Sequence, residues 1–68
     1  MKKELIEKPD AKLIGENGNI FNLMAIAKKA LSEVGKKEEA SEMIKRIITT
    51  SKSYEESLNI ISEYVNII

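Results

Sequence analysis

The sequence predicts a small, mainly α-helical domain of three helices, preceded by a short N-terminal extended strand. Three stretches of the 68-residue chain carry apolar residues three and four positions apart, the spacing of one helix face. The chain has no Cys and no His, which excludes disulfides, thiolate or imidazole metal sites and His-based catalysis. A domain of this size is marginally stable alone. Self-association, most simply as a homodimer, is therefore expected.

The N-terminal part of the chain is expected to divide into a flexible arm, residues 1–10, and a single domain, residues 11–68. Residues 11–15 alternate weakly between apolar and polar, which predicts a short strand. A lone strand leaves its backbone N–H and C=O groups unpaired, so it needs a partner. The C-terminal residues 64–68 and a second copy of the same strand in another subunit are the two candidates.

A turn rich in glycine and asparagine follows the strand, with the sequence Gly15-Glu16-Asn17-Gly18-Asn19. Asn17-Gly18 is a turn dipeptide because both residues tolerate positive φ. Asn19 is placed to cap the next helix. A helix N-terminus offers free N–H groups to an anion, so a small-anion or nucleotide site at Gly15, Asn17, Gly18 and Asn19 is one alternative. The pattern lacks the Lys-Ser/Thr of a P-loop and the third glycine of a dinucleotide fingerprint, which favours a plain capped turn.

The first two helices are expected over about residues 20–34 and 37–49. Gly35 separates them and suits a left-handed helix stop. In the second helix, Glu42 is spaced to pair with Arg46 one turn later. The apolar residues of this helix recur at i, i+3, i+4, i+7 and i+8, and they are Ala40, Met43, Ile44, Ile47 and Ile48.

The third helix begins with a capping box, in which Ser53 caps the N-terminus and Glu56 reaches back. If this helix continues to the chain end, its apolar residues cover about half of the helical wheel, whereas one core needs a stripe of about 100°. Two other helices cannot cover such a face. Either the last five residues pair as a strand with 11–15, or another subunit covers them. The predicted surface for self-association or a partner comprises Tyr54, Leu58, Ile61, Tyr64, Val65 and Ile68.

The charge balance is neutral, with 11 basic and 11 acidic residues, so no overall field drives the chain onto nucleic acid or anionic lipid. Residues 28–52 hold seven basic and four acidic residues, a net charge of +3, and residues 53–68 hold three acidic and no basic residues. A nucleic-acid-binding regulator, with the first two helices as a helix-turn-helix, is thus a second alternative. It is not favoured, because the second helix opens with glutamates and no aromatic residue accompanies the lysines. Its phosphate contacts would be Lys28, Lys29, Lys36 and Lys37.

No constellation of residues predicts catalysis. No pair of carboxylates can be placed across a cleft, and no calcium-loop series is present. We expect no enzyme activity, no cofactor and no metal. No apolar run approaches the ~20 residues of a membrane span, and the start lacks the apolar core of a signal peptide. A cytoplasmic protein without membrane contact is expected.

The opening Lys12-Leu13-Ile14-Gly15-Glu16-Asn17-Gly18-Asn19-Ile20-Phe21, the later Ser53-Tyr54-Glu55-Glu56-Ser57-Leu58 and the close Glu63-Tyr64-Val65 resemble a group of small bacterial and phage proteins. That group shares an L-x-G-x-(D/N)-G-N-x-F opening and a Y-x-x-x-L…YV close, and it has no known activity. The resemblance covers residues 12–66 loosely and implies a mobile-element setting. The favoured function is a non-enzymatic protein-interaction module, a phage or mobile-element regulator or inhibitor that binds a host or phage protein.

Overall fold

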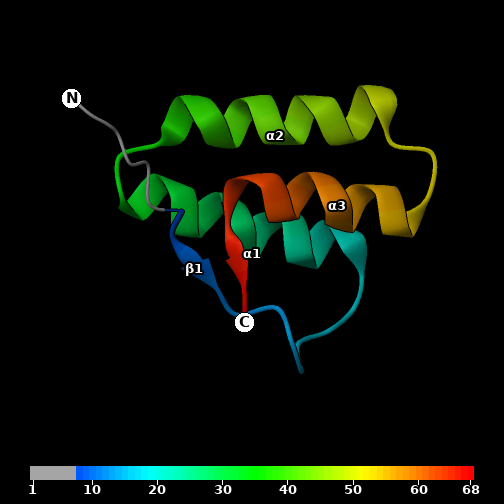
Figure 1. The fold of residues 1–68 in the computed structure, drawn as a ribbon, viewed down its shortest axis with the longest axis horizontal. Coiled ribbons are helices and arrows are strands. Elements are labelled where there is room, and N and C mark those ends of the chain that lie inside the picture. The colour runs from blue at the N-terminus through cyan, green and yellow to red at the C-terminus, as the bar shows by residue number, and fades with distance from the viewer. Residues whose placement is uncertain (1–7) are drawn as a thin grey trace.

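The domain is a bundle of three helices with a two-stranded sheet beside it, which confirms the predicted fold class. α2 runs antiparallel along α1, α3 packs against both, and the strands lie on the side of α1 away from α2 (Figure 1). The computed structural model describes residues 8–68, so residues 1–7 of the expected arm lie outside the described residues. The elements in chain order are β1 (Asp10–Ala11), α1 (Ile20–Glu33), α2 (Lys37–Thr50), α3 (Tyr54–Tyr64) and β2 (Asn66–Ile67).

The ends of α1 follow the local signals of the sequence. The Asn19 side-chain oxygen accepts a hydrogen bond from the Phe21 N–H at 2.8 Å, as expected of an N-cap. At the other end Gly35 adopts a φ of 79°, and the Lys36 N–H donates back to the Leu31 carbonyl at 2.8 Å. This is the Schellman arrangement. It turns the chain directly into α2.

The junction of α2 and α3 differs slightly from the expected capping box. Ser53 accepts from the Glu56 N–H at 3.1 Å, as predicted. The Glu56 carboxylate, however, accepts from the Lys52 N–H at 2.7 Å instead of from Ser53. α2 extends to Thr50, one residue further than expected, and the Thr50 hydroxyl donates to the Arg46 carbonyl at 2.6 Å.

The two strands come from opposite ends of the chain and pair in parallel, with Asp10 opposite Asn66. The final carbonyl, that of Ile68, accepts from the N–H groups of both Leu13 and Ile14 at 2.8 Å. Of the two partners left open for the N-terminal strand, the structure has the C-terminal end of the same chain. The pairing also includes residues 8–10, because the Asn66 side chain donates to the Lys8 carbonyl at 3.0 Å.

The turn before α1 uses a different glycine from the one expected. The Glu16 N–H donates to the Leu13 carbonyl at 3.1 Å, which closes a β-turn with Gly15 in its third position. Gly15 has a φ of 88°, the positive value that a type II turn requires there. Gly18, in the predicted dipeptide, is not a positive-φ residue.

The core lies between the three helices and is closed by the strand residues. Ala11 and Leu13, which alternate along the N-terminal extended segment, are both buried in it. The chain leaves the helix after Tyr64, and Val65 is extended, with φ −138° and ψ 158°. Ile61 and Val65 are 0% and 1% exposed, so the wide apolar face expected on a continuous third helix is divided between helix and strand. The buried apolar residues are Ala11, Leu13, Leu23, Met24, Ala27, Leu31, Ala40, Met43, Ile47, Ile60, Ile61 and Val65.

Candidate interaction surface

The six residues expected to form one surface at the end of the chain do not lie together. Ile61 and Val65 belong to the internal core, where no partner can touch them. Leu58 and Tyr64 are half-buried against that core. Only Tyr54 and Ile68 are exposed, at opposite ends of the unit formed by α3 and β2. The expectation of a continuous apolar face failed because it treated residues 65–68 as helical.

Tyr54 has a structural partner inside the chain. Its hydroxyl donates to the Gly18 carbonyl at 2.7 Å, which fastens the start of α3 to the turn before α1. The turn is further held by its asparagines, since the Asn19 N–H donates to the Asn17 side chain at 2.9 Å and the Asn22 side chain donates to the Asn17 carbonyl at 2.9 Å.

These bonds bear directly on the anion-site alternative. The backbone N–H groups of Asn19 and Phe21, which an anion would use, already donate to asparagine side chains. An anion needs unoccupied donors at a helix N-terminus. The Gly15–Asn19 turn is therefore organised as a cap, and it offers less to an anion than its sequence suggests.

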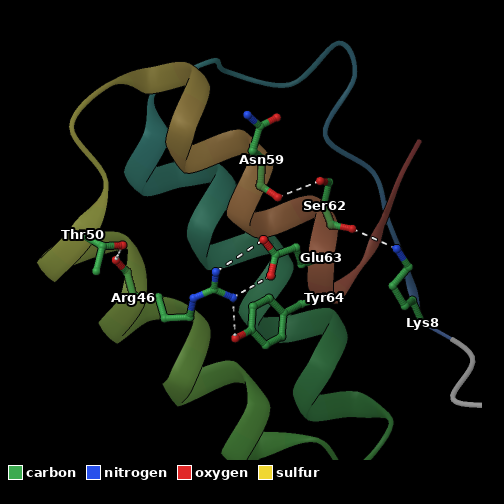
Figure 2. A network of polar contacts seen from close by, with 7 residues as sticks. All are labelled: Lys8, Arg46, Thr50, Asn59, Ser62, Glu63 and Tyr64. Atoms are coloured by element: carbon green, nitrogen blue, oxygen red, sulfur yellow. Dashed lines mark hydrogen bonds and ion pairs between the residues drawn. The ribbon is translucent and has the colours of Figure 1, made fainter.

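Tyr64 belongs to a polar cluster that joins α2 to the end of α3. The Arg46 guanidinium donates to the two Glu63 carboxylate oxygens at 2.7 and 3.3 Å, and to the Tyr64 hydroxyl at 3.1 Å. Figure 2 shows this bracket, with Lys8 reaching the same helix end through the Ser62 carbonyl at 2.9 Å. Arg46 thus bonds Glu63 on another helix. The spacing in the sequence predicted a bond to Glu42, one turn away on the same helix.

The electrostatics of this cluster follow from the two-pronged bond. Hydrogen bonding to Arg46 holds the pKa of the Glu63 carboxyl below its ordinary value, and the nearby Lys8 ammonium acts in the same direction. The same bond raises the pKa of Arg46, so the pair is charged throughout the physiological range. Both side chains remain partly exposed, and the arrangement ties two helices together.

The four lysines proposed as phosphate contacts are spread over different parts of the molecule. Lys28 projects from the middle of α1 beside α2. Lys36 is half-buried in the inter-helix turn, where it lines a small hollow of about 140 Å³ with Glu39, Glu63 and Tyr64. Lys29 and Lys37 are exposed. α1 and α2 lie along each other as a hairpin (Figure 1), unlike the steeply crossed helices of a helix-turn-helix.

A groove that the sequence reasoning missed lies between α1 and α2, and it is an open hollow of about 350 Å³. Its floor is apolar and its rim is basic. Ile48 is 67% exposed there although it is a large aliphatic residue, and Ile44 beside it is half-buried. We call this site the outer groove; it is lined by Lys28, Ser41, Ile44, Lys45, Ile48 and Thr49.

The apolar character of this side continues along α1. Phe21 and Ala25 precede Lys28 by seven and three residues, which places all three on one face of the helix. Phe21 is 71% exposed. The sequence did contain the signal, because α2 has two adjacent apolar pairs, Met43-Ile44 and Ile47-Ile48, and the core contact leaves Ile48 exposed.

Comparison of the chain with models of known protein families, with curated proteins and with solved structures gave no match. The resemblance to phage and mobile-element proteins therefore stays a prediction. Among residues 8–68, no group of carboxylates is arranged to hold a metal ion, and no helix is long and apolar enough to cross a bilayer.

Proposed function

We propose that this domain is a non-enzymatic protein-interaction module and that the outer groove is its docking surface. The observation that carries the proposal is the exposed apolar floor of that groove, above all Ile48, on the side of the α1–α2 hairpin left uncovered by α3. A concave site with an apolar floor and a few polar groups around it is the usual form of a binding site. A regulator or inhibitor from a phage or mobile element would act through such a surface.

The surface proposed here differs from the one that the sequence favoured, because Ile61 and Val65 lie inside the core. Self-association remains a separate proposal, and light scattering across a dilution series tests it. Neither the turn at Gly15–Asn19 nor the dispersed lysines offers a comparably continuous site for a nucleotide or for nucleic acid.

The test compares three baits in a capture experiment from bacterial lysate: the wild-type chain, Ile48→Asp and Ile14→Asp. Ile14 is a matched control, because it is 66% exposed and does not line the groove. We expect a protein that wild type and Ile14→Asp retain and that Ile48→Asp loses. Equal capture by all three baits would contradict the proposal. Melting curves of both variants should match wild type, since neither residue is in the core.

A further inference from the structure

We propose that the occupant of the outer groove is an acidic amphipathic helix of a partner protein. Its apolar stripe would lie on Ile44 and Ile48, and its carboxylates would face the ammonium groups of Lys28 and Lys45. This inference rests on the proposed function, and it names the chemistry of the partner that the groove selects.

The charge of the groove is the first argument. Of its six lining residues two are lysines and none is acidic. Among residues 8–68, ion pairs involve Lys12 with Glu16 and Arg46 with Glu63, and neither Lys28 nor Lys45 has a carboxylate within pairing distance. The basic residue next to Lys45 is thus neutralised within the fold, whereas the two lysines on the rim are not. A partner carboxylate would complement both of them.

The shape of the groove is the second argument. It follows α2 from Ser41 to Thr49, eight steps along the helix that rise about 12 Å, or roughly two helical turns. A shallow channel between two antiparallel helices receives a third helix, whose anchors recur at i, i+3 or i+4, and i+7. A third turn of that helix would cover Phe21, which shares the Lys28 face of α1. The occupant is therefore a helix of two to three turns.

A second copy of this chain is a poorer occupant. The acidic helix of the chain is α3, but its Ile60 and Ile61 are buried and its Glu63 is bonded to Arg46. A two-fold pairing of outer grooves would also bring the unneutralised Lys28 and Lys45 of both copies to one interface. A like-charge interface of this kind opposes association.

The probe is a pair of fluorescent three-turn helical peptides with the same leucine stripe. One carries glutamates beside the stripe, and its twin carries lysines at the same positions. Anisotropy titration of the full chain should show binding of the acidic peptide, at least about tenfold weaker binding of the basic twin, and a loss of that difference at high salt.

Substitutions in the chain separate the effect of the rim lysines from that of the apolar floor of the groove. Lys28→Glu/Lys45→Glu should weaken the acidic peptide about 10- to 30-fold and favour the basic twin. Lys29→Glu/Lys52→Glu has the same net charge but lies outside the groove lining, and it should leave the preference unchanged. Ile48→Asp should weaken both peptides, and Ile14→Asp neither.

Each other outcome overturns a specific statement. Equal binding of both peptides, insensitive to the double reversal, would refute the acidic partner and leave the docking function standing. No binding of either peptide at about millimolar concentration would refute both. A dimer in light scattering that Ile48→Asp dissolves would assign the groove to a second copy instead.

Discussion

Replacing Ile61 with Val tests whether the end of the chain is covered by its own fold or by another subunit. Ile61 is 0% exposed within a single chain, so the change removes one methylene from a closed core. Such a deletion costs about 0.5–1.5 kcal/mol. For a domain of this size that corresponds to a melting temperature lower by about 2–12 °C. Alanine is avoided because its cost of about 2–5 kcal/mol approaches the whole stability of a 68-residue domain, about 3–10 kcal/mol.

The assay is thermal unfolding followed by circular dichroism over a hundredfold range of protein concentration. Ile48→Val is the matched control, because the same methylene is removed at an exposed site and should cost within about 0.5 kcal/mol. The difference between Ile61→Val and wild type should be the same at every concentration. If Ile61 were buried by a second subunit, unfolding would require dissociation and the melting temperature would fall on dilution. A difference between Ile61→Val and wild type that changes with concentration, or equal effects of the two substitutions, would refute the internal core described here.

Two further predictions concern the polar contacts that hold the fold together. Glu63→Gln should lower the free energy of unfolding at neutral pH, and the difference from wild type should shrink as the pH falls below about 5, because the lowered pKa of Glu63 means that its contribution is lost when the carboxylate is protonated. Urea unfolding of both proteins across that pH range measures this difference, and a difference independent of pH would contradict the assigned bond to Arg46. Tyr54→Phe removes the hydroxyl that donates to the Gly18 carbonyl at 2.7 Å, so it should lower the free energy of unfolding by about 0.5–1 kcal/mol. Amide hydrogen exchange in the turn before α1 should become faster, and unchanged exchange would show that the bond does not hold that turn.

The helices were predictable because their ends are determined by capping residues close by in the sequence. Asn19 caps α1, Gly35 takes the positive φ that ends it, and Ser53 caps α3, each as its sequence environment indicated. Such signals involve atoms within a few residues of one another. Periodicity then identified the inward faces of the helices.

The remaining features depend on contacts between distant residues, which periodicity does not encode. The pairing of Asp10 with Asn66 joins residues from nearly opposite ends of the chain. The sequence alone could not decide between this pairing and pairing with the same strand of a second subunit. The helical wheel was extended past Tyr64 to residues 65–68, whose backbone is extended, so it assigned those residues to the wrong faces. The bond of Arg46 to Glu63 was also not predictable from local spacing. Glu42 lies nearer to Arg46 in the sequence, and only the packing of α3 on α2 brings Glu63 within bonding distance.

The outer groove follows from the topology of a three-helix chain. α3 covers one side of the α1–α2 hairpin and the strands pack beside α1 and α3, so no element of the described chain covers the other side of the hairpin (Figure 1). On a side left to solvent, Lys or Glu would have better helix propensity than Ile and would place a charged group in water. Ile48 and Phe21 stand there instead, at 67% and 71% exposure, so core packing does not account for them. One exposed apolar residue would need no explanation, but Ile48 in the groove and Phe21 on the Lys28 face of α1 together support the proposed docking surface.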